Sequence, residues 1–458
     1  MFDRLKVSEV FVPGKLPEHT YNPRSELELE LQLQDYLDET GSILTVAGPT
    51  KTGKSVLLRR VISDPVWVDG QGVDSVDELW RRVGDQLAVY TELELGTNQG
   101  TTGKGSIQGE AGIPVVKGRV GSELSLSEGS SVKYAVERPI GAAVRQALES
   151  SDRALVVDDF HFIDRDVQRQ IVRALKPLVL AGVPIIFVSI SHRVQDAVTA
   201  EPDMTGRVTS LPVKFWSEDE LLVIARKGFS KLRVTDPDDA IGRTLARESY
   251  GSPHLMQKFC REACKQDGVR ETSRWARALN PPSNWREFFA RQTDDASGDW
   301  FQRLLRGPQE RGSLRTKWTV KDGRRLDGYG LTLLGIANTG PKLTLRKDEI
   351  RRQVDLLVEG AGPAAHQTTR VLQHMTRIAA KRASTEPITA EQLDREIEEP
   401  QAVSDVQPVL EYMEEGPNSA LHIADPFFAF YLKWGSDVHL TRHSEEQGEE
   451  QDDELADE

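Results

Sequence analysis

The chain has 458 residues, a length that corresponds to about two to four domains. Its 58 lysines and arginines against 72 aspartates and glutamates give a formal net charge of −14, which disfavours a basic nucleic-acid-binding protein as the first interpretation. The sequence holds no run of about 18 uncharged apolar residues and no apolar core near its N-terminus, so we expect a cytoplasmic protein without a membrane segment or a secretion signal.

Short apolar strands alternate with helical patterns over the first half of the chain. The predicted strands are residues 42–47, 66–69, 154–157, 183–189 and 208–215. The predicted helices are residues 55–62, 76–90, 139–148 and 167–181. This alternation is typical of a parallel sheet with helices on both faces. We therefore predict an α/β core over residues 1–215.

Residues 96–131 interrupt this core with a stretch rich in glycine and serine. Polar and apolar residues alternate around 115–120 and 124–126, which indicates a β-hairpin carried on an inserted loop. An irregular surface loop is the alternative that the composition leaves open.

From Trp216 onward the pattern is helical. Ser217 and Glu220 form the N-cap and capping-box pair of the first helix, over 217–227. Further helices are predicted at 237–249 and 253–265, and together they form a helical lid over residues 216–285. The two cysteines, Cys260 and Cys264, lie one turn apart on the last of these helices, where we expect them to pack in the core.

A winged-helix-like domain is predicted over residues 286–440. The stretch 281–327, which spans the start of this domain, reads as irregular and polar, and helices follow at 331–337, 347–358 and 364–382. A hairpin formed by 409–412 and 420–423 comes next, with 383–407 as an insertion, and an apolar helix at 426–434 ends the domain. Nine acidic residues and no basic residue occupy 445–458, so residues 441–458 are predicted to be a disordered acidic tail.

The loop between the first predicted strand and the first predicted helix carries the strongest functional signal. It reads Gly48, Pro49, Thr50, Lys51, Thr52, Gly53, Lys54 and Ser55, a full G-x-x-x-x-G-K-[ST] pattern. Such a loop turns several backbone N–H groups toward one anion, and the helix that follows adds its positive end. Lys54 supplies a cation for the β- and γ-phosphates, and the Ser55 hydroxyl is a hard oxygen ligand for Mg²⁺. We therefore predict that these eight residues bind ATP and Mg²⁺.

A pair of acids ends the third predicted strand. Asp158 and Asp159 follow four apolar residues, which places the first carboxylate at the carboxyl end of a buried strand beside the loop. We predict that Asp158 holds Mg²⁺ and that Asp159 orients or deprotonates the attacking water. The alternative is that one of the two acids only caps the turn that follows.

Polar residues also follow the fourth predicted strand, at the same edge of the sheet. Ser191, His192 and Arg193 are equal candidates for a side chain that senses the γ-phosphate, and Arg193 is included among the catalytic candidates. Arg207 precedes the last predicted strand and is a candidate for stabilising transition-state charge on the nucleotide of a neighbouring subunit. A surface arginine without such a role is the alternative.

With these residues in place, the chain resembles the AAA+/STAND group of P-loop ATPases over residues 21–434, in particular the branch of origin-recognition-type initiators and archaeal-type ATPases. Asp158 and the residues that follow it resemble the Walker B motif of these proteins. Residues 423–434 resemble the helix that closes their winged-helix domain.

The resemblance adds four binding residues. Tyr21 and Arg24, followed by Glu28, resemble a box that contacts adenine in those families, which implies that both residues bind the nucleotide base. Pro253 and His254 resemble a lid motif that touches the nucleotide and reports its state, with a histidine where many members carry a charged sensor.

The resemblance further implies an ATP hydrolase that works as a Mg·ATP-controlled switch. ATP held between core and lid favours a closed arrangement, and ADP releases it. Turnover in such proteins is often slow or stimulated by a partner, and the output is a homo-oligomer or a recruited protein, in bacterial defence or regulation among other settings.

The alternative function is an initiator or loader ATPase that binds duplex DNA through its winged helix. Residues 303–352 contain thirteen basic and five acidic residues and adjoin the predicted recognition helix at 364–382. DNA contact through residues 303–382 therefore stays open beside a protein-interaction role.

Overall fold

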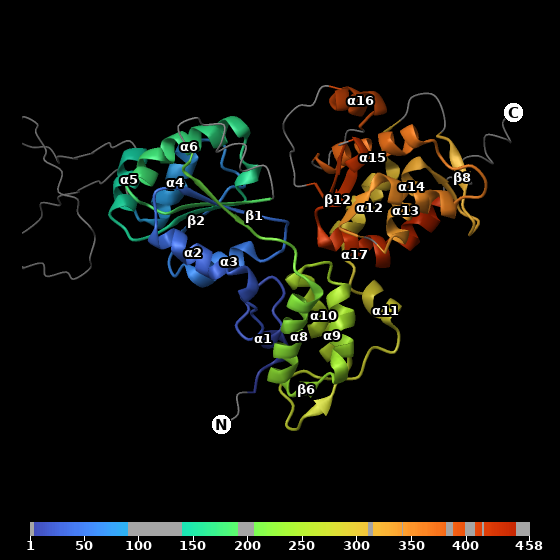
Figure 1. Ribbon diagram of the computed structural model, residues 1–458, viewed down its shortest axis with the longest axis horizontal. Coiled ribbons are helices and arrows are strands. Elements are labelled where there is room, and N and C mark those ends of the chain that lie inside the picture. The colour runs from blue at the N-terminus through green and yellow to red at the C-terminus, as the bar shows by residue number, and fades with distance from the viewer. Residues whose placement is uncertain are drawn as a thin grey trace, which may run out of the picture.

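The computed structural model describes residues 4–89, 140–190, 206–309, 315–340, 342–381, 388–398, 408–414 and 416–445. Within these residues the chain forms an α/β core, a helical lid and a C-terminal domain, which Figure 1 shows as three lobes. The predicted hairpin at 96–131 lies outside the described residues, as do the sensor candidates at 191–193. In the described part of the chain, no helix combines the length and hydrophobicity that crossing a bilayer requires.

The core is a five-stranded parallel sheet in the order β2-β3-β4-β1-β5. Its strands are β1 (Ile43–Ala47), β2 (Val66–Asp69), β3 (Leu155–Asp158), β4 (Ile185–Ser189) and β5 (Val208–Pro212). The inner strands β1, β3 and β4 are short runs of apolar, largely β-branched residues because helices cover both of their faces. The carboxyl ends of β1, β3 and β4 open at one edge of the sheet, and that edge carries the predicted site.

Two layers of helices cover the sheet. On one face α2 (Leu29–Asp38) and α3 (Lys54–Val61) share an apolar cluster with Leu44 and Val46. On the other face α4 (Val76–Gln86), α5 (Ile140–Glu149) and α6 (Arg165–Leu180) pack on residues that include Ile43 and Phe187. Two single turns, η1 (Ser25–Leu27) and η2 (Phe160–Phe162), join these elements.

The lid contains α8 (Glu218–Leu232), α9 (Ala240–Arg247), α10 (Pro253–Gln266) and α11 (Trp285–Ala290). The turn η4 (Pro237–Asp239) and the short strands β6 (Val234–Thr235) and β7 (Arg277–Ala278) link them. The first helix, α1 (Val7–Val10), packs with the lid rather than with the core, since Val7, Val10 and Phe11 join the apolar cluster of the lid. Cys260 and Cys264 are buried free thiols in the same cluster.

The C-terminal domain combines helices with a small antiparallel sheet in the order β10-β12-β11. Its elements are α12 (Asp295–Arg306), β8 (Lys317–Thr319), β9 (Arg325–Asp327), α13 (Gly328–Asn338), β10 (Thr344–Arg346), α14 (Lys347–Leu357), α15 (Ala365–Ala379), α16 (Ala390–Glu398), β11 (Leu410–Met413), η5 (Gly416–Asn418), β12 (Ala420–Ile423) and α17 (Pro426–Trp434). From α13 to β12, leaving α16 aside, the order is helix, strand, helix, helix, strand, strand. The predicted fold class, a P-loop-type α/β core with a helical lid and a C-terminal α+β domain, is confirmed.

The stretch 281–327 was predicted to be irregular, and this expectation is wrong. It contains α11, α12 and the hairpin of β8 and β9. The two helices begin at the caps Asn284 and Asp294, whose side chains accept hydrogen bonds from the first turn. Helix α11 has only six residues, and the first turn of α12 carries no large apolar side chain, which obscures the helical period in the sequence. Helical structure also continues over 436–445, five residues into the predicted tail, because Leu440 is fully buried.

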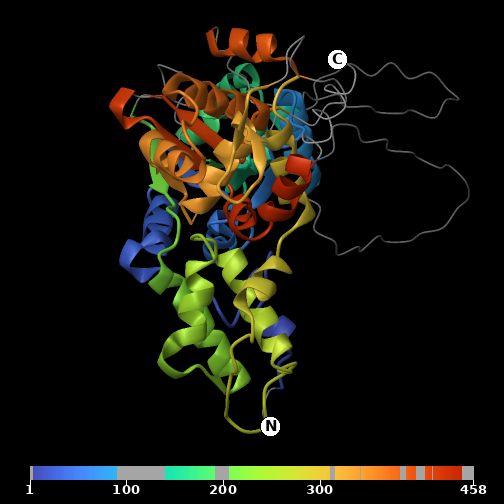
Figure 2. The ribbon, with the colours of Figure 1, turned by 90° about the vertical axis from the view of Figure 1, so that its right-hand side faces the viewer.

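Helix α17 lies between the lid and the C-terminal domain (Figures 1 and 2). Its residues Phe427 and Phe430 join the apolar cluster of the lid, while Phe428 and Leu432 join that of the C-terminal domain. Glu248 of the lid also binds this helix, through Lys433 at 2.6 Å and through the indole N–H of Trp434 at 2.8 Å. One helix therefore connects the two lobes through both of its faces.

Candidate functional site

The predicted phosphate loop joins β1 to α3, with glycines at its two critical positions. A Cβ on Gly48 would lie 2.0 Å from the carbonyl oxygen of Val213, because the chain after β5 runs alongside the loop. Gly53 is the N-cap of α3 with a φ of 95°, a conformation that side-chain-bearing residues rarely adopt. These glycines allow the loop to turn tightly and start a helix whose N-terminus faces the cavity.

The Lys54 ammonium lies inside the loop. It donates to the carbonyl oxygens of Gly48 at 2.8 Å and Pro49 at 2.7 Å. Burial lowers the pKa of Lys54 to about 8, and the carboxylates of Asp158 and Asp159 act in the opposite direction. The ammonium is therefore held in position in a poorly solvated site, where an anion would be its strongest partner.

The acidic pair lies beside Ser55, as predicted from the sequence. The Ser55 hydroxyl donates to Oδ2 of Asp158 at 2.9 Å, and the backbone N–H of Asp159 donates to Oδ1 of Asp158 at 3.0 Å. Burial raises the pKa of Asp158, and burial together with the charge of Asp158 raises the pKa of Asp159 to about 6. The Ser55 hydroxyl oxygen and the half-buried Asp158 carboxylate form a ligand pair that suits Mg²⁺.

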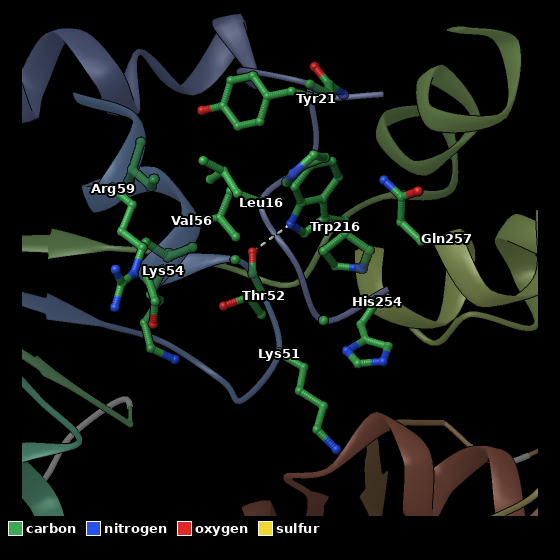
Figure 3. Close-up of a pocket in the computed structure, with 18 of the residues that line it drawn as sticks. Leu16, Tyr21, Lys51, Thr52, Lys54, Val56, Arg59, Trp216, His254 and Gln257 are labelled. Atoms are coloured by element: carbon green, nitrogen blue, oxygen red, sulfur yellow. Dashed lines mark hydrogen bonds between the residues drawn. The ribbon is translucent and has the colours of Figure 1, made fainter. Parts of the chain in front are cut away.

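These groups open into a cavity of about 460 Å³ between the core, the lid and the N-terminal arm (Figure 3). Its polar end carries the loop and the two aspartates. Its apolar end carries Leu16 and Tyr21 of the N-terminal arm (residues 12–24), Val56 of α3 and Trp216 of the lid. The volume lies within the range of about 300–1,000 Å³ that small-molecule and cofactor sites span. One end of the cavity thus suits phosphates, and the other suits an apolar ring.

Trp216 is a site residue that the sequence did not identify. Its indole N–H donates to the carbonyl oxygen of Thr52 at 2.8 Å, so the first residue of the lid segment is tied to the phosphate loop. Thr52 is itself buried and donates to the carbonyl oxygen of Pro49 at 2.9 Å. No local pattern marks this tryptophan, because the contact exists only once β5 lies next to β1.

The two residues of the predicted adenine box line the cavity. The Tyr21 hydroxyl donates to Glu30 at 2.6 Å. The buried Arg24 guanidinium binds Glu220 at 2.7 Å and the carbonyl oxygens of Lys214 and Phe215 at 2.9 and 3.1 Å. Arg24 therefore fixes the N-terminal arm to the junction of core and lid.

Arg24→Ala is expected to lower the free energy of unfolding by about 3 kcal/mol, because it leaves Glu220 and two carbonyl groups without their donor. Arg81→Ala is the control, since Arg81 pairs with Glu78 on the surface and its removal should leave the urea midpoint nearly unchanged. Urea unfolding measures both changes. Equal midpoints for the two variants would contradict this role of Arg24.

The predicted lid contacts, Pro253 and His254, form the first turn of α10 and line the cavity. Burial, with the charges of Lys51, Lys258 and Arg261, lowers the pKa of His254 to about 4, so its imidazole is neutral near pH 7. The ring packs edge-on against Phe427 of α17, with ring centres 5.1 Å apart. His254 therefore lies between the cavity and the C-terminal domain as an uncharged aromatic group.

Of the two remaining catalytic candidates, Arg193 lies outside the described residues, and Arg207 does not line this cavity. Arg207 is exposed at the amino end of β5, where its carbonyl oxygen accepts a bond from Ile43, on the sheet edge opposite the phosphate loop. Any role for Arg207 at a nucleotide therefore concerns a neighbouring chain.

The affinity for ATP is expected to fall as the pH rises above about 8. Lys54 loses its proton there in the free protein, while bound phosphates would keep it charged, so binding above about pH 8 requires proton uptake. The loss should approach tenfold per pH unit. Calorimetric titration between pH 7 and 9.5 measures it, and Lys54→Arg is the control because a guanidinium stays charged. A flat profile for the unchanged chain would contradict this account of Lys54.

Comparison with solved structures finds similar proteins among archaea. The structure is similar to Cdc6p from Pyrobaculum aerophilum, with 11% identity, 96% of this chain and 98% of that chain covered, and a TM-score of 0.39. It is also similar to Aeropyrum pernix ORC1 in complex with DNA, with 12% identity, 96% of this chain and 98% of that chain covered, and a TM-score of 0.39. A third similar structure is ORC2 of the same organism in ADPNP–ADP complexes, with 12% identity, 95% of this chain and 98% of that chain covered, and a TM-score of 0.45. The sequence matches no protein-family model and no curated protein. Identities and TM-scores this low carry no conclusion about activity or partners.

Proposed function

We propose that the protein binds and hydrolyses Mg·ATP and that the nucleotide state controls its assembly or its recruitment of a partner. The observation that carries the proposal is the phosphate loop: Lys54, the N-terminus of α3, and the pair of Ser55 and Asp158 at 2.9 Å face one cavity. Tyr21, Arg24, Pro253 and His254 line the same cavity, which supports the base and lid contacts predicted for them.

Each polar group has a distinct role in this proposal. Backbone N–H groups of residues 48–55 and the Lys54 ammonium bind the β- and γ-phosphates. Ser55 and Asp158 would hold Mg²⁺, which neutralises phosphate charge when bound. Asp159, with a pKa of about 6, is ionised at neutral pH and accepts the proton of the attacking water at its carboxylate. Its short side chain is consistent with slow turnover.

Size-exclusion chromatography with ATP, with ADP and without nucleotide tests the switch. We expect elution at a larger size, alone or with an added partner, in one nucleotide state and not in the others, because differential affinity for two arrangements is what a switch requires. Identical elution in all three conditions, with ATP binding established separately, would reduce the protein to a nucleotide hydrolase without assembly control.

A second candidate function is binding of duplex DNA by the C-terminal domain. The order of its elements supports it, because α15 stands where a winged helix carries its recognition helix. Acidic helix α16 already pairs two cations of this region, with Arg370 bound by Asp394 at 2.5 Å and Lys381 bound by Glu396 at 2.5 Å. DNA binding through this face therefore requires that α16 be displaced.

The double variant Asp394→Asn/Glu396→Gln tests this second candidate. It should bind duplex DNA at least about tenfold more tightly than the unchanged chain, with an affinity that falls steeply as salt is added. Glu391→Gln, which removes an exposed carboxylate of the same helix, is the matched control. Equal binding by all three chains, or an affinity that salt does not change, would exclude the α15 face as a DNA contact.

A further inference from the structure

Lys51, in the phosphate loop, lines the nucleotide cavity, and its side chain extends toward the C-terminal domain (Figure 3). Its φ of 59° places it at a tight turn of the loop. Its ammonium lies 3.7 Å from the ring centre of Phe427 and 3.7 Å from Oδ2 of Asp425. Both partners belong to the start of α17, so the phosphate loop directly contacts the helix that joins lid and C-terminal domain.

The partners of Lys51 are held in place independently of it. Asp425 is the N-cap of α17 and accepts a hydrogen bond from the backbone N–H of Phe427 at 2.9 Å. The Phe427 ring is buried and also packs against His254 of the lid. Core, lid and C-terminal domain therefore meet at one cluster, formed by Lys51, His254, Asp425 and Phe427, next to the phosphate loop.

Charge decides how this cluster responds to a ligand. Burial disfavours the Asp425 carboxylate, raising its pKa, and the Lys51 ammonium compensates. A triphosphate in the loop places several negative charges near both groups. It repels Asp425 and competes with it for Lys51, and ADP does so less because it carries less charge. The neutral His254 offers no charge that would offset this repulsion.

We propose that Lys51, Asp425 and Phe427 form a latch that holds the C-terminal domain on the phosphate loop, and that ATP weakens the latch more than ADP does. This inference rests on the proposed function and adds its regulation. The moving part is the C-terminal domain, and the signal passes through Lys51, which lines the cavity and also contacts that domain. By linkage, the latch must lower the affinity for ATP to the same extent that ATP weakens the latch.

Asp425→Asn tests the latch. Asparagine keeps the N-cap of α17 and removes the charge, so the fold should be retained. We expect the affinity for Mg·ATP to rise about fivefold or more, and the affinity for Mg·ADP to rise less. Phe427→Leu, which keeps an apolar side chain and removes the ring face, should change the affinities in the same direction. Asp355→Asn, an exposed carboxylate of α14, is the matched control.

A second readout follows the domain itself. Fluorophores on Glu149→Cys in the core and Arg352→Cys in the C-terminal domain report the interdomain distance by energy transfer, since the two native cysteines are buried. ATP should shift this distance in the unchanged chain, and Asp425→Asn should show the shift without nucleotide.

The outcomes separate the latch from the proposed function. If the unchanged chain binds no ATP, the proposed function fails. If the unchanged chain binds ATP, but Asp425→Asn and Phe427→Leu have the same affinities for Mg·ATP and Mg·ADP and the same interdomain distance as the unchanged chain, the latch proposal is wrong. The proposed ATP site is then retained.

Discussion

Lys54→Ala is expected to weaken Mg·ATP binding by at least about a hundredfold, because it removes a charge-assisted contact to the phosphates that is worth about 3 kcal/mol in a poorly solvated site. In the free chain the carbonyl oxygens of Gly48 and Pro49 hold the Lys54 ammonium inside the loop, within reach of a bound phosphate. Isothermal titration calorimetry with MgATP measures the affinity of each chain.

Lys51→Ala is the matched control, because it removes an equal charge from the same loop. The Lys51 ammonium contacts Asp425 and Phe427 of the C-terminal domain, so this change should alter the affinity for ATP by less than about tenfold. Equal losses of ATP affinity in the two variants would mean that the affinity depends only on the overall charge of the loop, which would contradict the role assigned to Lys54.

Asp159→Asn is expected to leave ATP binding nearly unchanged and to slow hydrolysis by about 10²–10⁴, the usual contribution of a general base. Asparagine tolerates the φ of 52° that Asp159 adopts, so the backbone should be retained. Single-turnover hydrolysis measures the chemical step. In the unchanged chain the rate should also fall as the pH drops through about 6, where Asp159 takes up its proton, and the variant should lack this acid limb.

The control for Asp159 is Asp69→Asn. Asp69 ends the neighbouring strand β2, and its charge helps to raise the pKa of both Asp158 and Asp159. Removing this charge should lower the pH at which the hydrolysis rate begins to fall, and it should change the maximal rate by less than about tenfold. If Asp159→Asn hydrolyses ATP as fast as the unchanged chain, another group activates the water and the role assigned to Asp159 is wrong.

The sequence predicted the parts of the site that depend on local order. A loop between a strand and a helix, and an acidic pair at the end of an apolar strand, need only short patterns, so Lys54, Ser55 and Asp158 were assigned to one site. The structure brings Ser55 within 2.9 Å of Asp158 because β3 and β1 end at the same edge of the sheet. The same reasoning identified the five strands.

Short sequence patterns could not predict contacts between segments that lie far apart in the chain. Trp216 reaches Thr52, and Lys51 reaches Asp425, only after the lid and the C-terminal domain have packed. Helix α11 was missed because its six residues are too few to display a helical period, and α12 because its first turn carries no large apolar side chain. The cavity therefore has one end that the sequence predicts and another that tertiary packing determines.

A crystal structure with magnesium and a non-hydrolysable ATP analogue tests the central claim most directly. We expect the β- and γ-phosphates within the loop of residues 48–55, the Lys54 ammonium moved from the carbonyl oxygens of Gly48 and Pro49 onto the phosphates, and Mg²⁺ between Ser55 and Asp158. Analogue bound elsewhere, with Lys54 still on the two carbonyl groups and no ion at Asp158, would contradict the account.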